Sequence, residues 1–369
     1  MDEQLVLPNY SGANLRGIMP ALLGPAGTRS LPAWFPEPVR RATQVVVLLI
    51  DGLGWLQLQD RLALAPTLAT MIGGPITTVA PSTTATALTS VATGLTPAEH
   101  GIVGYRIDLG GDVLNVLRWA TAEGDARKRH VPRDVQPYPA FLGQSVPVVS
   151  KAELEHSGFT AAHLVGGRPA GWRTMSNIAV EIAAQLAQGA PVVYAYYDGI
   201  DKVAHEKGFG PYYDAEVVAV DRLVADVRAR LGDDTALLVT ADHGQVHVGR
   251  NLVTPAPSVL ALTRSQSGEG RFRWLHARPG AAADLVAAAT EHHADVAWVV
   301  GREQVLDEGW FGPGISGPIA GRLGDVALVA RSAVSFDDPA DSGPHPLVCR
   351  HGSLTAAEMY VPLLAARGR

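Results

Sequence analysis

The chain has 369 residues, of which 47% are hydrophobic and 18% charged, so it can bury a large core and is not intrinsically disordered. Its formal net charge of −6 at pH 7, with no basic run, argues against nucleic-acid backbone binding as its main task. An anionic substrate stays open, because a bound metal can supply positive charge locally. The single cysteine, Cys349, excludes a disulfide framework, an iron–sulfur cluster and a cysteine-based zinc finger.

The N-terminal segment, MDEQLVLPNYSGANLRG, starts acidic and has no apolar stretch, so we expect no signal peptide. The densest apolar run near it, residues 45–50, is far shorter than the roughly 18 residues that a membrane-spanning helix needs. We therefore expect a soluble, cytoplasmic protein without a membrane partner. The sequence leaves the oligomeric state open.

Strand-like and helical patterns alternate along the chain. Continuous apolar, β-branched runs predict strands over 44–50 (QVVVLLI), 191–197 (PVVYAYY) and 236–240 (ALLVT), with a weaker strand over 161–165. Apolar residues at spacings of three and four predict the longest helix over 212–231. These patterns predict an α/β fold in which helices cover both faces of a mostly parallel sheet.

Residues 251–345 follow a different pattern. Strands are predicted over 271–277, 296–300 and 326–336, and a helix over 281–292. We therefore divide the chain into an N-terminal extension (1–40) packed on the core, a core (41–250 and 346–369) and a small α+β insertion or cap (251–345).

Acidic and histidine side chains follow the ends of the three clearest strands. The residues are Asp51, Asp201, His205, Asp242 and His243. Ligands of open α/β sheets bind outside the carboxyl ends of the strands. One aspartate at a strand end is usually a turn or cap residue, but three such clusters indicate a shared site. Aspartate oxygen and histidine nitrogen are the ligands that zinc and similar divalent ions prefer.

The spacing of these residues supports a metal site. Asp201 and His205 are four residues apart, so on a helix they face the same way and can share one metal, although a surface Asp–His pair has the same spacing. Asp242 and His243 would point to opposite faces of a regular strand but can converge in the turn after it. His351, in Arg-His-Gly-Ser, is a weak signal by itself.

A small, hydroxyl-rich segment covers residues 81–94 (PSTTATALTSVATG) and is followed by Pro-Ala-Glu-His-Gly. A Ser/Thr cluster before a helix is most often an N-cap. A helix N-terminus also offers free backbone N–H groups to a phosphate. A hydroxyl that touches a metal at that place can act as a nucleophile.

Taken in order, these motifs resemble the alkaline phosphatase superfamily, and within it the nucleotide pyrophosphatase/phosphodiesterase (type I phosphodiesterase) family. The motifs are Asp51-Gly, P-x-x-Thr…Thr-Gly…His-Gly-Ile over 81–102, Asp201-x-x-x-His, Asp242-His-Gly and a late His351-Gly. The resemblance covers about residues 44–250 and 346–366. It says little about 1–40 and 251–345.

The resemblance implies an alkaline-phosphatase-like catalytic core that hydrolyses phosphodiester or phosphoanhydride bonds of a small phosphate-ester substrate at a site with two divalent metal ions. Zinc is expected, with manganese as the alternative. One ion would be held by Asp201, His205 and His351, and the other by Asp51, Asp242 and His243. Thr84 matches the family's nucleophile, which contacts a metal and forms a phospho-threonine intermediate.

A phosphomonoesterase, phosphonate hydrolase or phosphomutase would keep the same ligands, so these stay open as alternatives. Diesterases of the family carry an asparagine three residues after the nucleophile, where this chain has Ala87. The preference between diesters and monoesters is therefore also open. A sulfatase would use a modified cysteine or serine as nucleophile, and Cys349 is far from residues 81–94.

Other enzyme classes lack their motifs here. There is no G-x-S-x-G nucleophile elbow and no G-x-x-x-x-G-K-[ST] phosphate loop. A binding protein that has lost turnover would lack a ligand or the threonine, and neither is missing. His247 could lie beside the site, but a structural role is expected, and His292 and His293 are expected at a solvated helix end. Tyr105, Tyr197, Trp55 and Trp172 could stack on a base or an aromatic leaving group, but core packing is the expected role.

Overall fold

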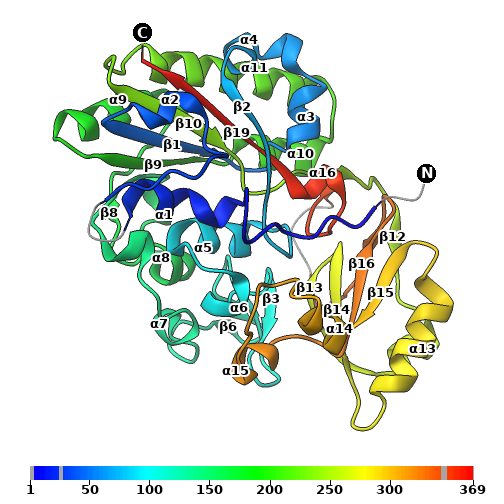
Figure 1. Cartoon of the computed structure of the whole chain (residues 1–369). Coiled ribbons are helices and arrows are strands. Elements are labelled where there is room, and N and C mark those ends of the chain that lie inside the picture. The colour runs from blue at the N-terminus through cyan, green and yellow to red at the C-terminus, as the bar shows by residue number, and fades with distance from the viewer. Residues whose placement is uncertain (1–3, 25–27, 342–346, 369) are drawn as a thin grey trace.

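The computed structural model describes residues 4–24, 28–341 and 347–368 (Figure 1). Its centre is a seven-stranded sheet. In spatial order the strands are β2 (Ile72–Thr77), β19 (Tyr360–Arg367), β10 (Thr235–Thr240), β1 (Gln44–Ile50), β9 (Val192–Tyr197), β7 (Pro147–Val149) and β8 (Arg168–Pro169). β1 pairs in parallel with β10 and β9, and β19 pairs antiparallel with β10 and β2.

Helices cover both faces of this sheet, as Figure 1 shows, with α9 (Met175–Ala187) and α11 (Pro211–Arg228) along one face and α1 (Ile18–Leu23) and α5 (Thr84–Thr93) along the other. This arrangement buries the side chains on both sides of β1 and β10, which explains their continuous apolar runs. The predicted fold class is confirmed.

The predicted strand over 161–165 is wrong. Its first three residues belong to helix α8 (Gly158–His163), and its last two lie in the cap and turn that follow. The helix begins after Ser157, whose side chain accepts a hydrogen bond from the Thr160 backbone N–H. This N-cap satisfies a backbone donor that a helix start otherwise leaves free, and the short apolar run could not reveal it. The predicted long helix is α11, which ends at Arg228.

Shorter helices and turns connect the strands of the main sheet. They are α2 (Glu37–Arg40), α3 (Trp55–Gln59), α4 (Pro66–Ala69), α6 (Pro97–His100), α7 (Pro132–Val135), α10 (Gly199–Lys207) and α16 (Ala356–Met359). A small antiparallel sheet contains β3 (Arg106–Asp108), β4 (Val113–Asn115), β5 (Ala120–Thr121) and β6 (Gly124–Asp125).

A second sheet lies apart from the main one, at the lower right of Figure 1. Its order is β13 (Thr263–Glu269), β14 (Phe272–Ala277), β16 (Val326–Ala330) and β15 (Ala297–Gly301). Helices α12 (Pro257–Leu262), α13 (Ala282–His293), α14 (Arg302–Asp307) and α15 (Gly317–Ala320) accompany it. The segment predicted as one strand over 326–336 is two strands, because β17 (Ser335–Phe336) leaves β16 and pairs with β12 (Leu252–Val253).

Alternate residues of β16 enter two different cores. Val326, Leu328 and Ala330 pack in a small cluster with residues of α13, whereas Ala327 and Val329 join the large core of the chain. Period-two alternation places successive side chains on opposite faces, so both faces of this strand are buried. The second sheet is thus packed against the main body, and the predicted domain boundaries at 40, 250 and 345 stay predictions.

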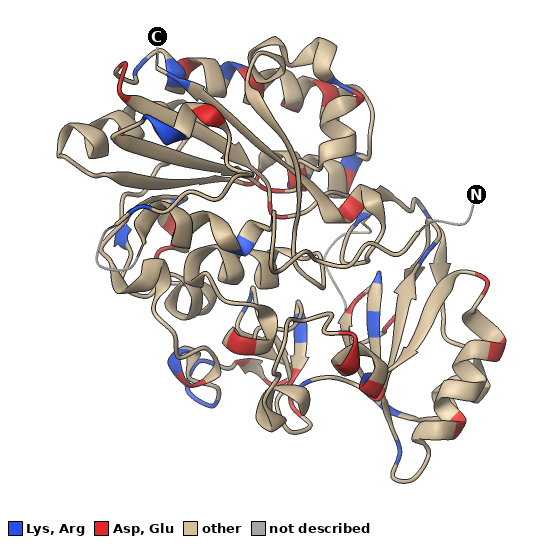
Figure 2. Ribbon diagram, in the orientation of Figure 1, with Lys and Arg blue, Asp and Glu red and all other residues tan. Residues whose placement is uncertain are grey.

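Lysine and arginine are dispersed over many elements, as Figure 2 shows, rather than gathered on one of them. Across residues 4–24, 28–341 and 347–368, no helix is both long and apolar enough to span a membrane. The cytoplasmic location stays a prediction.

Candidate active site

The carboxyl ends of β1, β9 and β10 meet at one edge of the main sheet because these neighbouring strands are parallel. Asp51 follows β1, and the next residue, Gly52, donates its backbone N–H to Asp242 Oδ1 at 3.0 Å. Gly52 has φ +73°, and a Cβ there would lie 3.0 Å from Asp201 Cα. Only glycine fits both the conformation and the close approach, so Asp51-Gly52 brings two strand ends together.

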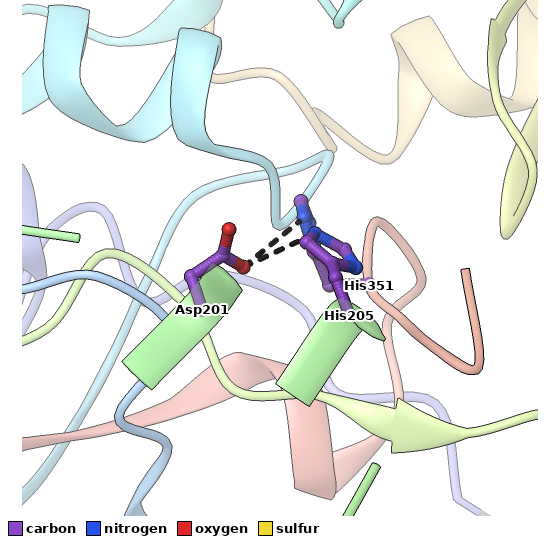
Figure 3. Close-up of side chains that lie close together, drawn as sticks. All are labelled: Asp201, His205 and His351. Carbon is purple, nitrogen blue, oxygen red and sulfur yellow. Dashed lines mark ion pairs between the residues drawn. The ribbon is translucent and has the colours of Figure 1, made fainter. Parts of the chain in front are cut away.

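Asp201, His205 and His351 form the first group of side chains that converge at this edge (Figure 3). Asp201 and His205 lie one turn apart on α10, and His351 follows β18 (Cys349–Arg350), which pairs with β11 (Val246–His247). Asp201 Oδ1 lies 3.2 Å from His205 Nε2 and 3.9 Å from His351 Nε2. The predicted i, i+4 pair therefore faces the third residue.

Asp51, Asp201 and His243 form the second group of side chains close enough to share a metal, and Asp242, predicted as the third ligand, lies beside His243. His243 Nε2 lies 3.5 Å from Asp51 Oδ1 and 3.4 Å from Asp242 Oδ2. Asp201 belongs to both groups, since one of its carboxylate oxygens also lies within 4.8 Å of ligand atoms of Asp51 and His243. The His243 and His351 rings stack with centroids 3.6 Å apart, so the two groups are adjacent.

Each of the three histidines has its Nδ1 beside a backbone carbonyl, which can only accept a hydrogen bond. His205 donates to the Cys349 carbonyl at 2.7 Å, His243 to that of Gly244 at 3.0 Å and His351 to that of Ser82 at 3.0 Å. Neutral imidazole with a proton on Nδ1 leaves the Nε2 lone pair free for a metal. In each of the three histidines, Nε2 is also the ring nitrogen that lies near an aspartate of the site.

Two buried carboxylate oxygens in this site, Asp51 Oδ1 and Asp242 Oδ2, have no hydrogen-bond partner in the described parts of the chain. Burial and the charge of Asp242 raise the pKa of Asp51 well above its usual value, and burial and the His243 ring lower the pKa of His351 well below its own. Divalent cations would relieve both effects, because they offset the carboxylate charges and accept the imidazole lone pairs. The residues present therefore fit such ions.

Thr84 is the first residue of α5, and its Oγ1 lies 3.1 Å from His243 Nε2. Because His243 Nδ1 carries the proton, the Thr84 hydroxyl is the donor in this contact. Thr83 is the N-cap, but its side chain makes no capping hydrogen bond. The α5 N-terminus therefore faces the site with backbone N–H groups that the cap residue does not occupy.

All ten residues of α5 are buried, although half of them carry hydroxyls. Thr89 Oγ1 donates to the Ala85 carbonyl and Thr93 Oγ1 to the Thr89 carbonyl, both at 2.7 Å, so these hydroxyls are satisfied within the helix. Gly94, with φ +75°, ends the helix in the left-handed conformation. The hydroxyl-rich pattern is thus a buried helix whose first residue alone points a hydroxyl at His243.

Two cavities meet at Thr84. One, the Glu269 cavity, has a volume of about 340 Å³ and is lined by several charged side chains, among them Arg118, Glu269, Asp341 and Arg350. The other, the Phe159 cavity, has a volume of about 290 Å³ and is lined by Leu88, Leu117, Leu154, Phe159 and Leu164 together with polar and charged residues, among them Ser157, His163, Asp198 and Lys202. Thr84, Leu117, Asp201 and Lys202 line both.

Several residues at the site were missed in the sequence analysis. The Tyr196 hydroxyl donates to Asp51 Oδ2, and Gln245 Nε2 donates to Asp201 Oδ1 at 2.7 Å. Tyr196 lies near the end of β9 and Gln245 directly follows the Asp-His-Gly motif, but neither residue type signals a role from sequence. Lys151 and Lys202 both form ion pairs with Asp198, with shortest distances of 2.7 Å.

Two structural expectations need correction, and one question stays open. Tyr105 lines the Glu269 cavity rather than lying only in the core. His293 is buried, not solvated, and its Nε2 accepts the Ala256 backbone N–H at 3.1 Å. Ala87 is fully buried and lines neither cavity, and the preference between diesters and monoesters stays open. His247 lies 3.8 Å from the Cys349 sulfur, beside the site.

Ser267, His276 and Asp108 are arranged like a hydrolytic triad, with Ser267 Oγ 2.8 Å from His276 Nε2 and His276 Nδ1 3.5 Å from Asp108 Oδ2. All three residues are buried, and Ser267 has no exposed surface. A substrate cannot reach this serine, so the arrangement joins β13, β14 and β3 structurally.

The sequence matches the family model of type I phosphodiesterase / nucleotide pyrophosphatase over residues 45–177 and 170–354. No curated protein matches it. Among solved structures, murine ectonucleotide pyrophosphatase / phosphodiesterase 5 is similar, with a TM-score of 0.64, 15% identity and coverage of 88% of each chain. An inactive form of that protein in complex with AMP gives a TM-score of 0.65, 14% identity, and coverage of 88% of this chain and 87% of that one.

Phosphonoacetate hydrolase from Sinorhizobium meliloti, in complex with phosphonoformate, is similar with a TM-score of 0.64 and 17% identity. The match covers 100% of this chain and 94% of the hydrolase. At these identities the likeness to the solved structures shows the fold, and the family match rests on the sequence.

Proposed function

Since the chain belongs to the type I phosphodiesterase / nucleotide pyrophosphatase family, we propose that it is a metal-dependent hydrolase of phosphodiester or phosphoanhydride bonds, with Thr84 as its nucleophile. One divalent ion would be held by Asp201, His205 and His351, and the other by Asp51, Asp242 and His243. Zinc is the expected metal and manganese the alternative. When bound, the ions would supply positive charge that favours ionisation of the Thr84 hydroxyl and polarises the phosphoryl group.

Residues at the start of α5 fit the other two roles, which are attack on phosphorus and binding of the phosphoryl group. Thr84 presents its hydroxyl at the N-terminus of a ten-residue helix, where the backbone N–H groups and the helix dipole favour an anionic phosphoryl group. Attack by this oxygen on phosphorus, in line with the leaving group, forms a phospho-threonine that keeps the other substituent of the substrate, and releases an alcohol from a diester or a phosphate from an anhydride. Water then hydrolyses the phospho-threonine and restores the hydroxyl.

The observation that carries the diester assignment is the pair of cavities that meet at Thr84. A phosphodiester has two substituents on phosphorus, and a monoester has only one. The five apolar side chains of the Phe159 cavity suit an apolar or aromatic substituent, and the buried Glu269 and half-buried Arg350 in the wall of the Glu269 cavity suit a polar one. AMP in the murine structure and phosphonoformate in the bacterial one are small phosphorus oxyanions, which supports a substrate of that size.

A substrate panel tests this proposal. Metal-loaded protein is assayed with an aryl phosphodiester, a dinucleotide, an aryl phosphate monoester, a phosphonate monoester, phosphonoacetate and a sulfate ester. We expect kcat/KM for the diester or the dinucleotide to exceed that for the monoester at least about tenfold, which corresponds to roughly 1.4 kcal/mol. Faster cleavage of the monoester than of every diester would refute the diesterase assignment.

Two matched leucines test the Phe159 cavity. Leu154 lines it and is 39% exposed, whereas Leu56 lies on α3, lines neither cavity and is 40% exposed. We expect Leu154→Asn to raise KM for an aryl diester relative to a methyl diester, and Leu56→Asn to change neither. If both substitutions change KM for the aryl diester equally, the Phe159 cavity no longer supports the diesterase assignment.

Phosphonate hydrolysis is the second candidate, because the bacterial phosphonoacetate hydrolase is similar over the whole of this chain. Phosphonoacetate carries one substituent on phosphorus, so it would occupy only one of the two cavities. Turnover of phosphonoacetate above that of every diester in the panel would favour this candidate.

A further inference from the structure

Glu269 is a buried carboxyl group in the wall of the Glu269 cavity, at the end of β13 in the second sheet. The residue is 6% exposed, and neither carboxylate oxygen has a hydrogen-bond partner of good geometry within the described residues. Burial raises the pKa of Glu269, and the Thr83 side chain lies near enough to lower that pKa by a smaller amount. Leaving such a group unpaired costs free energy, because burial removes its hydrogen bonds to water. Because this buried carboxyl group lies beside a cavity that reaches Thr84, it can accept a hydrogen bond from a ligand there.

An ion pair holds this acceptor in place. Arg271, two residues after Glu269, donates from Nε and Nη2 to the two carboxylate oxygens of Glu358, each at 2.8 Å, and both side chains are fully buried. Arg271 Nη1 also donates to the carbonyls of Ser332 and Val334. Because Glu358 belongs to α16, the turn that carries Glu269 is fixed against the main body.

Gly352, which follows His351, allows the close approach of Glu269. A Cβ at Gly352 would lie 2.5 Å from Glu269 Cγ, and the glycine has φ +122°. The carboxyl group is thereby placed beside the segment that carries a proposed metal ligand. Its position relative to the reacting groups depends on the fold and not on a mobile side chain.

Arg350 supplies the complementary group. It lines the same cavity, and its Nε is buried without a hydrogen-bond partner in the described part of the chain. It also lies near Gly270, the residue after Glu269, since a Cβ there would be 3.1 Å from Arg350 Nη1. The cavity wall thus offers one unpaired acceptor and one unpaired donor from neighbouring positions.

The chemistry of these two groups selects a hydroxyl. A hydroxyl donates one hydrogen bond and accepts others, so it can satisfy a carboxyl and a guanidinium together. A carboxylate on the substrate would face Glu269, and an ammonium group would face Arg350 and Arg118. Neither charged group is compatible with both sides of the wall.

We propose that Glu269 and Arg350 are specificity-determining residues that bind a hydroxyl group on the substituent of the substrate that enters the Glu269 cavity. Glu269 accepts the hydroxyl proton, and Arg350 donates to the hydroxyl oxygen. This inference rests on the proposed function, because it concerns one of the two substituents of a phosphodiester. It predicts an alcohol component with at least one further hydroxyl, as in glycerol or a sugar.

The experiment compares propyl, 3-hydroxypropyl and 3-aminopropyl p-nitrophenyl phosphate as substrates of the metal-loaded protein, with the uncatalysed rate subtracted. For the unchanged protein we expect kcat/KM for the hydroxypropyl ester to exceed that for the propyl ester at least about tenfold. Glu269→Leu should bring this ratio close to one. Glu269→Gln should keep most of it, because the amide oxygen still accepts the hydroxyl proton.

Glu291→Leu is the matched control, since Glu291 is exposed on α13 of the same region and lines no cavity near Thr84. Thermal unfolding of each variant checks that it folds. The inference is wrong if Glu269→Leu lowers turnover of both esters equally, or leaves their ratio unchanged. A preference for the aminopropyl ester that Glu269→Gln removes would instead assign an ammonium group to this cavity and overturn the hydroxyl proposal.

A binding measurement separates this inference from the proposed function. Metal-loaded Thr84→Ala is titrated calorimetrically with 3-hydroxypropyl phosphate and with propyl phosphate, with and without Glu269→Leu. If Thr84→Ala binds the hydroxypropyl compound more tightly in a way that depends on Glu269, while the unsubstituted metal-loaded protein cleaves no diester, the proposed function is refuted and the hydroxyl site is retained. Diester cleavage without this binding preference would refute the hydroxyl site alone.

Discussion

The two sheets contribute to the cavities around Thr84 in different ways. The main sheet supplies carboxylates and imidazoles from the ends of parallel strands, so their positions follow from where β1, β9 and β10 stop. The second sheet supplies Glu269 from a hairpin turn, and its position follows from the buried pair Arg271–Glu358. The reacting groups and the proposed substrate-selecting group therefore come from separate elements and can be perturbed separately.

The largest effect is expected from removing the metal, which concerns the main sheet alone. Six side chains in two groups predict about two divalent ions per chain. Exhaustive chelation should abolish turnover, because the remaining carboxylates would repel an anionic substrate. Elemental analysis counts the ions, and addition of zinc or manganese should restore activity. Turnover that persists after chelation would contradict the two-metal site.

The next effect is expected from the nucleophile. Thr84→Ala should lower kcat by about a thousandfold or more, since no other group replaces the attacking oxygen. The fold and the metal content should persist, because Thr84 makes its contact with the site and not with the core. Thr84→Ser keeps the hydroxyl and should retain measurable activity. Rapid quenching with labelled substrate should trap phosphate on the peptide that contains Thr84.

Thr86 provides the matched control for this experiment. It lies two residues further along α5, is fully buried, and its Oγ1 has no hydrogen-bond partner in the described residues. Thr86→Val preserves the shape and removes only an unpaired hydroxyl, so stability should be unchanged or rise slightly and turnover should be retained. If Thr84→Ala is active and Thr86→Val is inactive, the nucleophile lies two residues further along α5 than predicted.

The same difference between the two sheets explains what the sequence could predict. The apolar runs of β1, β9 and β10 and the acidic residues after them are close in sequence, so local patterns predicted both the strands and the group of aspartates and histidines. The resemblance to a family added Thr84 and His351. Tyr196 and Gln245 were missed because their contacts with Asp51 and Asp201 join distant segments.

The role of Glu269 could not be predicted from the sequence for a similar reason. A glutamate at the end of a strand carries no signal, and its burial depends on Arg271, Glu358 and Gly352, which are brought together only by the fold. The strand predicted over 161–165 failed because a capped helix and a short buried strand share one apolar pattern.

The pair Arg271–Glu358 should have a smaller effect on turnover and a clear one on stability. Arg271→Met leaves the Glu358 carboxylate buried without its partner, which should lower the free energy of unfolding by about 3–5 kcal/mol. Adding Glu358→Gln removes the charge and should recover part of this loss. Urea denaturation measures both variants.

These variants also sharpen the comparison between the sheets. If the ion pair positions Glu269, the double variant should lose preference for the hydroxypropyl ester more than it loses turnover of the propyl ester. Equal loss with both esters would mean that the main and second sheets act as one unit at the site.

The smallest expected effect is on the pH dependence of stability and concerns a histidine that belongs to neither group of site residues. His100, at the end of α6, is fully buried; its Nδ1 accepts the Ile102 backbone N–H at 3.1 Å, and its Nε2 lies 2.8 Å from Ser90 Oγ. Burial, with a smaller contribution from Arg322, lowers the pKa of His100 to about 3. In the unfolded chain the pKa of a histidine is about 6.5.

The sign of the pH effect follows from these two values. Below pH 6.5 the unfolded chain binds a proton at His100 that the folded protein does not, so stability is lost as the pH falls from 6.5 towards 3, by up to about 1.4 kcal/mol per pH unit. Urea denaturation of chelator-treated protein at several pH values measures the slope without metal release. His100→Asn should flatten the slope of stability against pH, because the asparagine does not titrate.

Ser90→Ala, the matched control, removes the hydroxyl partner but keeps the buried ring, so it should shift stability equally at every pH and leave the slope unchanged. If His100→Asn retains the full acid slope, the acid sensitivity belongs to the proposed metal-binding histidines of the main sheet rather than to this buried one.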